Sequence, residues 1–144
     1  MGALLSIDDL TKSFAPGTVV LRNLNLEVAS DDRLVIIGPS GGGKSTLIRC
    51  IMGLESIDSG EIRFDGEPYI YVQKNNSRTK VEKTSQLKVG MVFQNYTLFP
   101  HLSVMKNLVL ASVKVRNETK EVAKAKATEL LRRFNLLDKE SEYP

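Results

Sequence analysis

Residues 38–46 read Gly-Pro-Ser-Gly-Gly-Gly-Lys-Ser-Thr, which has the spacing G-x-x-x-x-G-K-[ST] of a phosphate-binding loop. The loop follows the apolar run 34–37 (Leu-Val-Ile-Ile) and precedes the apolar, helix-like segment 47–52. A strand before the loop and a helix after it are the context that this motif requires, and they argue against a merely flexible glycine turn. The sequence therefore predicts a nucleotide-binding loop between a buried strand and a helix.

The backbone of this loop is expected to do most of the binding. Gly38, Gly41 and Gly43 allow positive φ angles and let the backbone approach phosphate oxygens, because glycine has no Cβ in the way. The amides from Gly41 to Thr46 are expected to point inward, at the positive end of the following helix. The residues expected to bind the nucleotide are Gly38, Ser40, Gly41, Gly42, Gly43, Lys44, Ser45 and Thr46.

Three side chains at the end of the loop add specific chemistry. Lys44 supplies a mobile positive charge for the β- and γ-phosphates. Ser45 offers a hydroxyl oxygen, the type of hard ligand that Mg²⁺ prefers. Thr46 can donate a hydrogen bond to the α-phosphate. The loop predicts a bound nucleoside triphosphate with Mg²⁺, but it does not indicate which reaction follows.

Length and composition are those of one ordinary globular domain: 144 residues, of which 42% are hydrophobic and 26% charged. The net charge of +3, with the lysines spread along the chain, gives no reason to expect a nucleic-acid partner. Cys50 is the only cysteine, which favours a reducing compartment and a buried side chain over a reactive thiol. No apolar stretch approaches the ~20 residues that cross a bilayer, and no secretory signal opens the chain. We expect any work at a membrane to depend on a bound partner.

The spacing of apolar residues predicts the strands. Alternating patterns predict half-buried strands over 5–7, 19–28 and 59–66, the last of them closed by an Asp-Gly turn. Continuous apolar runs at 34–37 and 89–93 predict strands that are buried on both faces.

Helices are expected mainly in the last third of the chain. One helix is expected over 44–54 after the glycine loop, one begins after the N-cap residue Ser103, and an amphipathic helix is expected over 119–135. The polar segment 73–88 is expected to be a surface connection with a short helical piece.

Three further stretches give the loop a family context. They read Leu54-Glu55-Ser56-Ile57-Asp58-Ser59-Gly60-Glu61-Ile62, Val92-Phe93-Gln94 and Leu98-Phe99-Pro100-His101-Leu102. Together with the loop, they make essentially all 144 residues resemble the ATP-binding subunit of an ATP-binding-cassette (ABC) transporter. Within that family, the stretch 98–115 is most similar to importers of polar amino acids.

The resemblance implies an α/β P-loop NTPase fold with a RecA-like parallel core, an antiparallel β subdomain and the start of a helical subdomain. Residues 1–144 would form a partial nucleotide-binding domain, with the β subdomain and P-loop core in 1–100 and the start of the helical subdomain in 101–144. In the family, a signature motif, an acidic strand, a catalytic glutamate and a switch histidine come later. We therefore expect a C-terminally incomplete domain of marginal stability that by itself turns over ATP negligibly.

The resemblance also assigns roles outside the loop. Phe14 occupies the place of an aromatic residue that stacks on adenine, and the alternative is a plain core residue. Gln94 would reach Mg²⁺, together with Ser45, and would orient the attacking water, which makes Gln94 and Lys44 the expected catalytic pair. The segment Tyr96–Leu102 would contact the membrane-embedded permease.

The predicted function is the binding and hydrolysis of ATP, coupled to import of a small solute, by resemblance a polar amino acid. The expected partners are ATP, permease subunits and a second ATP-binding subunit, identical or paired. The expected location is the cytoplasmic face of the cell membrane, held there by the permease. The alternatives are a non-catalytic nucleotide-binding fragment, a soluble ABC-type ATPase, or another phosphate-loop enzyme such as a small-molecule kinase. The antiparallel strands expected before the loop argue against the kinase.

Overall fold

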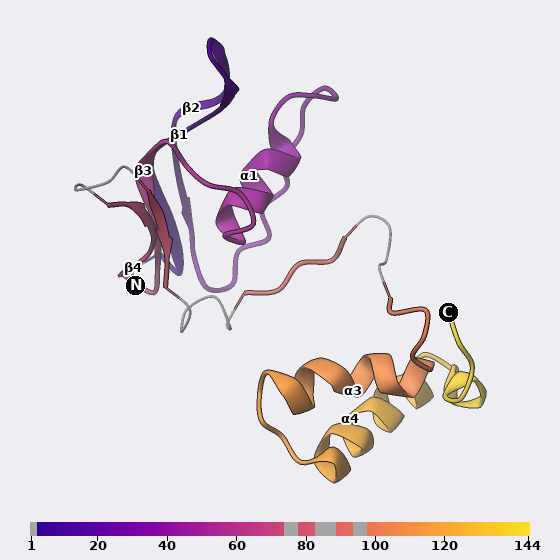
Figure 1. Cartoon of the computed structure of the whole chain (residues 1–144). Coiled ribbons are helices and arrows are strands. Elements are labelled where there is room, and N and C mark those ends of the chain that lie inside the picture. Colours follow the sequence, from indigo (N-terminus) through magenta and orange to yellow (C-terminus); the bar gives the residue numbers. More distant parts are fainter. Residues whose placement is uncertain (1–2, 74–77, 83–88, 94–97) are drawn as a thin grey trace. The chain divides into compact units, whose positions relative to one another are not determined.

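Two long antiparallel strands, β1 (Leu5–Ala15) and β2 (Thr18–Val28), open the first of two units in the computed structural model (Figure 1). The structure describes residues 3–73, 78–82, 89–93 and 98–144. The two units are Met1–Met91 and Val92–Pro144.

The sheet of the first unit is antiparallel throughout, in the order β2-β1-β3-β4-β5. Its other strands are β3 (Ser59–Phe64), β4 (Glu67–Val72) and β5 (Thr79–Val81). Asp65 and Gly66 join β3 to β4 with φ values of 56° and 79°, and two successive positive φ angles are what a tight hairpin of the I′ type requires.

The alternating patterns predicted this sheet in part. The expected strands at 5–7, 19–28 and 59–66 are confirmed by β1, β2 and β3. Strands β4 and β5 were not predicted, although the aromatic and β-branched residues Tyr-Ile-Tyr-Val at 69–72 are typical of a strand. The segment 73–88, expected to include a short helical piece, contributes β5, and its residues 74–77 and 83–88 lie outside the described ones.

Helix α1 (Lys44–Ile51) begins directly after the glycine loop and packs on the sheet. It ends just before Gly53, whose φ of 65° is left-handed, as expected of a glycine that ends a helix. Its buried residues join the apolar side chains of the strands in one core. The members of this core are Ile7, Leu10, Leu21, Leu47, Cys50, Ile57, Ile62, Tyr69 and Ile70.

Two strands predicted from continuous apolar runs are not formed. Residues 34–37 and 89–93 carry no regular secondary structure. Val35 and Ile37 are 76% and 90% exposed, and Val92 is 84% exposed. A central strand needs a hydrogen-bonded neighbour at each edge, and no strand of the described residues pairs with either run. The prediction of buried strands at these two places is therefore wrong for this structure.

The second unit consists mainly of two packed helices, α3 (Val104–Lys114) and α4 (Lys120–Arg133). Ser103 and Thr119 cap them, and each side chain accepts a hydrogen bond of 3.4 Å from the backbone amide three residues further on. A short 3-10 helix, η1 (Leu137–Lys139), follows. The buried residues of α4 lie at helical spacing and are Ala123, Ala127 and Leu131. Both helices predicted for this part of the chain are confirmed.

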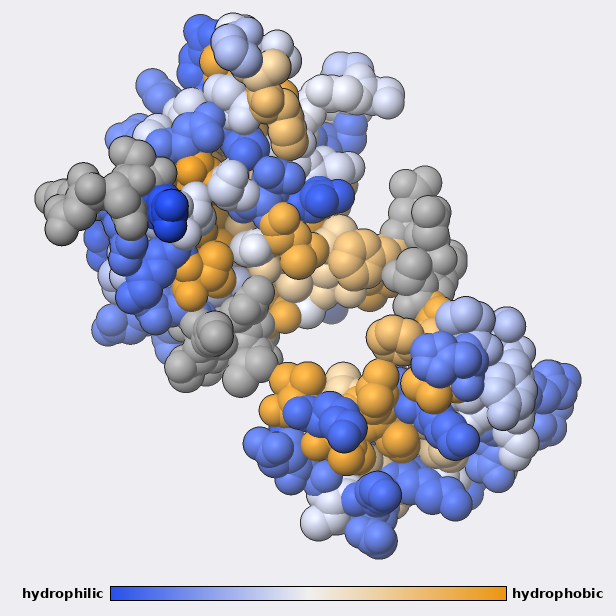
Figure 2. Space-filling model, in the orientation of Figure 1, coloured by the Kyte–Doolittle hydropathy of each residue, from blue (hydrophilic) through white to orange (hydrophobic). Residues whose placement is uncertain are grey.

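Apolar side chains remain at the surface of each unit, as Figure 2 shows in orange. In the first unit they include the unpaired run 34–37, and in the second they include Phe99 and Phe134. Clustered apolar surface of this kind marks places where other polypeptide can pack. Among the described residues, no helix has both the length and the apolar character needed to span a membrane.

Candidate nucleotide-binding site

The glycine loop turns tightly into the start of α1. Gly43 caps the helix in the left-handed conformation with φ of 80°, and Gly41 has φ of 79°, so both use the conformational freedom that glycine offers. Gly38 does not use this freedom, since its φ lies outside the left-handed region. The turn begins only after Gly38, where the Gly42 amide donates to the Pro39 carbonyl oxygen at 3.2 Å, so no left-handed residue is needed earlier.

Gly43 also lies close to β2. A Cβ at this position would come within 3.1 Å of side-chain carbons of Val20 and Leu21 and of the Val20 carbonyl oxygen. Contacts this short are tight, and together with the positive φ they make any residue with a Cβ strained at this position. The end of the loop is therefore held against the sheet, which fixes where α1 starts.

The first turn of α1 presents unpaired backbone donors. By helical geometry, the amides of Lys44, Ser45 and Thr46 have no carbonyl partner within the helix. Gly43 offers no side chain to cap them, and the first turn holds no acidic residue. The positive end of the helix is therefore open to an anion from outside the chain.

The Lys44 side chain lies across the loop. Its Nζ donates hydrogen bonds to the carbonyl oxygens of Gly38 at 2.8 Å and Pro39 at 2.6 Å. Residues 40–46 line an open hollow of about 170 Å³ beside it. Because neutral carbonyls are weaker partners for an ammonium than a charged phosphate, the Lys44 ammonium is available to an incoming polyphosphate.

Phe14 lies at the end of β1 and does not line this hollow. Its side chain is 58% exposed, so the alternative of a plain core residue is wrong. The Nζ of Lys12 lies 5.0 Å from the centroid of the Phe14 ring. The ring is thus an exposed aromatic surface with a cation beside it.

Gln94 and the first part of the expected permease contact, Tyr96 and Thr97, lie outside the described residues. The rest of that segment is described. Leu98 and Phe99 are 53% and 51% exposed, so this part of the segment presents apolar side chains at the surface.

The turn that carries Phe99 is tied to helix α3 by one side chain. Asn107 accepts a hydrogen bond from the Phe99 amide at 2.8 Å and donates to the carbonyl oxygens of Phe99, Leu102 and Ser103 at 3.1, 2.9 and 3.1 Å. His101 meets the Phe99 ring edge-on, with 5.9 Å between ring centroids. This turn therefore has a defined shape although its apolar side chains are exposed.

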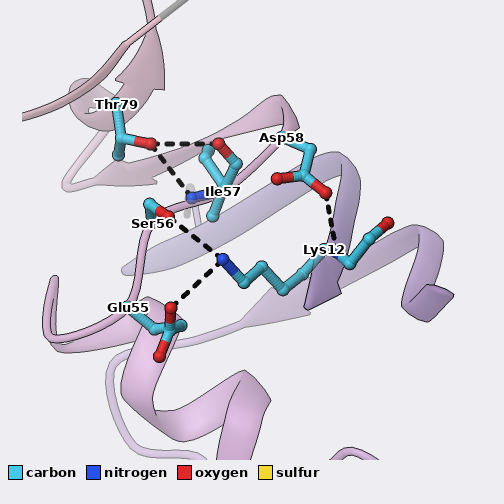
Figure 3. Close-up of polar contacts among 7 residues, drawn as sticks. Lys12, Glu55, Ser56, Ile57, Asp58 and Thr79 are labelled. Carbon is cyan, nitrogen blue, oxygen red and sulfur yellow. Dashed lines mark hydrogen bonds and ion pairs between the residues drawn. The ribbon is translucent and has the colours of Figure 1, made fainter. Parts of the chain in front are cut away.

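Sequence reasoning missed a polar network around Lys12, which Figure 3 shows. Lys12 is 5% exposed, and its Nζ donates to Ser56 Oγ at 3.0 Å and pairs with Glu55 Oε1 at 3.1 Å. The available signal was a lysine two residues after the buried Leu10 in a strand, where an apolar residue is the usual choice.

Comparisons with known proteins agree on a family. The ABC transporter family model matches residues 21–144. The glutamine transport ATP-binding protein GlnQ of Escherichia coli is 40% identical over 141 residues, which cover 98% of this chain and 56% of that protein. The arginine transport ATP-binding protein ArtM of Bacillus subtilis is 39% identical, with 98% and 56% covered. The glutamate/aspartate import ATP-binding protein GltL of Escherichia coli is 43% identical, with 87% and 49% covered. The chain spans about half the length of these relatives.

Two solved structures share the fold. One is the ATP-binding cassette MJ0796 in a dimeric post-hydrolysis state bound to ADP and Pi, with a TM-score of 0.75 and 26% identity. It is matched over 97% of this chain and 61% of the other. The second is cbiO1 of Clostridium perfringens, with a TM-score of 0.71 and 23% identity. The match covers 99% of this chain and 55% of cbiO1. The P-loop NTPase fold expected from the sequence is confirmed by these neighbours, although the described residues form only its antiparallel sheet and some of its helices.

Proposed function

The chain belongs to the ABC transporter family, and from that premise we propose that it binds ATP as the ATP-binding subunit of an importer for polar amino acids. The observation that carries the proposal is the glycine loop: a Gly43-capped helix start, free amides and Lys44 held beside an open hollow. The names of the relatives, which refer to glutamine, arginine and glutamate or aspartate, support the class of solute. Because the chain spans about half of those proteins, hydrolysis and import are proposed for the assembly in which it works.

The loop would hold the phosphates in the following way. The Lys44 ammonium leaves the carbonyl oxygens of Gly38 and Pro39 for the β- and γ-phosphates, and Thr46 donates to the α-phosphate. The remaining contacts come from the backbone around Gly38, Ser40, Gly41, Gly42 and Gly43. The polyphosphate thereby satisfies the donors that the first turn of α1 leaves open.

The residues present fit a magnesium ion that arrives with the nucleotide. Ser45 is exposed at the helix start and offers a hard hydroxyl ligand, but the first turn holds no carboxylate to balance a double positive charge. The phosphates supply the balancing negative charge, so Mg²⁺ is expected to bind together with ATP and only weakly without it. When bound, Mg²⁺ neutralises the charge on the β- and γ-phosphates. Gln94 is proposed as a second contact to Mg²⁺ and to the attacking water.

Further contacts are proposed to adenine, to the permease and to a second ATP-binding subunit. Phe14 would stack on adenine through its exposed ring. A permease would contact the segment Tyr96–Leu102, where Leu98 and Phe99 are half exposed, and would hold the subunit at the cytoplasmic face of the membrane. A second ATP-binding subunit, identical or paired, would share the ATP sites.

The test is calorimetric titration of the 144-residue chain with Mg-ATP and, separately, with tripolyphosphate. We expect both to bind, and we expect K44A to weaken both by at least about tenfold because the main counter-charge is lost. K80A is the matched control: Lys80 lies in the same unit and pairs with Glu82 at the surface, so its removal leaves both affinities unchanged. Equal affinities for the wild-type chain and K44A would refute the proposed phosphate site.

A further inference from the structure

Lys12 is a buried cation with no role in the phosphate site described above. It lies on β1, is 5% exposed, and shares its strand with the fully buried Leu10. A charge at such a place is costly unless it is paired and hydrogen-bonded. The Lys12 ammonium has both kinds of partner: its Nζ pairs with Glu55 Oε1 at 3.1 Å and donates a hydrogen bond to Ser56 Oγ at 3.0 Å.

The segment that holds the Lys12 ammonium is itself anchored on both sides. Ile57 exchanges two 3.0 Å hydrogen bonds with the hydroxyl of Thr79 (Figure 3). Asp58 donates its amide to the Thr11 carbonyl oxygen at 2.9 Å, and its carboxylate accepts from the Ser13 amide at 2.6 Å. The position of the ammonium is therefore set by β1 and β5 together.

The third neighbour of this ammonium is the ring of Phe14, whose centroid is 5.0 Å from Nζ. Phe14 is 58% exposed and is not among the buried core residues, so packing in that core does not hold the ring. A cation held beside an aromatic face attracts the ring and limits its rotamers. Lys12 therefore holds the Phe14 ring from one side, while the remaining surface of the ring is exposed to solvent.

We infer that Lys12 is a positioning residue for the nucleotide base: it holds Phe14 ready to stack on a purine ring. This inference rests on the proposed ATP site and deepens it. Lys12 does not touch the nucleotide. It acts through Phe14, and Glu55 and Ser56 act through Lys12.

The test compares ATP with tripolyphosphate, which lacks a base. The chains are the wild type, K12M, F14A and the double variant K12M/F14A, each checked by circular dichroism for folding. K12M keeps the length of the side chain but removes its charge, and we expect it to weaken ATP binding about three- to tenfold while tripolyphosphate binding changes less than about twofold. In the F14A background, K12M is expected to cause no further loss of ATP affinity, because the residue through which Lys12 acts is gone.

Each other outcome has a definite meaning. Three results would overturn the inference. K12M could weaken ATP and tripolyphosphate binding equally, it could weaken ATP binding in the F14A background as much as in the wild type, or it could leave ATP affinity unchanged. Should K12M fail to fold, S56A removes one hydrogen bond to the ammonium and leaves its pair with Glu55. S56A is then expected to lower the ratio of ATP to tripolyphosphate affinity, and an unchanged ratio overturns the inference. If the wild-type chain binds neither ligand, the proposed phosphate site fails instead.

Discussion

Gly60 faces the carbonyl oxygen of Asp8 so closely that a Cβ on Gly60 would lie 2.5 Å from that oxygen. Gly60 is the second residue of β3 and has φ of 86°, and β1 is irregular opposite it, where the register shifts between Asp8 and Thr11. Two strands can approach at this point only because one residue has no side chain.

G60A is expected to lower the free energy of unfolding by about 2–4 kcal/mol, since it adds a clash with backbone atoms to the cost of left-handed φ. G66A is the matched control: Gly66 has φ of 79°, but a Cβ there would meet nothing within 4 Å. Its cost should be only about 1–2 kcal/mol. Urea unfolding of both variants measures the difference, and equal losses would show that the contact with Asp8 is unimportant.

Tyr69 is fully buried in β4, and its hydroxyl has no hydrogen-bond partner among the described residues. An unpaired buried hydroxyl costs free energy, so Y69F is expected to leave stability unchanged or raise it by about 1 kcal/mol. Y71F is the contrast, because the Tyr71 hydroxyl bonds to Glu82 Oε1 at 3.1 Å and its loss should be mildly destabilising. Thermal unfolding of the two variants checks the sign, and a clear loss in Y69F would point to a partner for its hydroxyl.

Cys50 is expected to resist alkylation while the chain is folded. Burial raises the pKa of its thiol from 9.0 to about 11, and the nearby charge of Lys12 only partly opposes that shift. At pH 8 the thiolate fraction is therefore roughly a hundredfold below that of an ordinary thiol. Iodoacetamide labelling followed by mass spectrometry measures the rate with and without urea. Rapid labelling of the folded chain would contradict the burial of this residue.

The same pKa difference links stability to alkaline pH. Below pH 9 the Cys50 thiol is protonated in both folded and unfolded chains, so it adds no pH dependence. Between about pH 9 and 11 the unfolded chain loses this proton while the folded chain keeps it, which favours unfolding as pH rises. C50A should accordingly lose less stability than the wild type from pH 8.5 to 10.5, as followed by urea midpoints. Parallel curves for the two chains would count against the raised pKa.

Asn107 is expected to hold the turn that presents Phe99. N107A removes one acceptor and three donor contacts at once, so the Phe99 amide should exchange with solvent at least about tenfold faster. N107D keeps an acceptor for that amide but loses the donors, and it should give an intermediate rate. Hydrogen–deuterium exchange with mass spectrometry of the peptide covering 98–102 makes the comparison. Identical protection in all three chains would mean that other contacts hold the turn.

Local signals in the sequence account for what could be predicted. Alternating apolar residues place β1, β2 and β3, capping residues place the helices of the second unit, and the glycine loop places α1. The Asp-Gly pair marks the turn after β3, and the run Tyr-Ile-Tyr-Val at 69–72 favours a strand, so β4 was predictable from the sequence although it was not predicted.

Features that depend on distant residues could not be predicted in this way. The apolar run 34–37 indicates burial, but it does not supply the neighbouring strands that burial requires, and the run is exposed. The pairing of Lys12 with Ser56 joins residues 44 positions apart, and no local pattern announces it. The motif shows which glycines permit positive φ, but the folded turn decides which of them adopt it: Gly41 and Gly43 do, and Gly38 does not.

The sequence contains a single histidine, and its ring meets Phe99 edge-on at an interplanar angle of 70°. Aromatic ring currents depend steeply on distance and angle, so the imidazole protons of His101 should resonate away from their free-solution frequencies. Any molecule that turns Phe99 would move those signals. The chain thus carries its own single-site spectroscopic reporter in the segment proposed to meet the permease, and docking there can be followed without attaching a dye or replacing a residue.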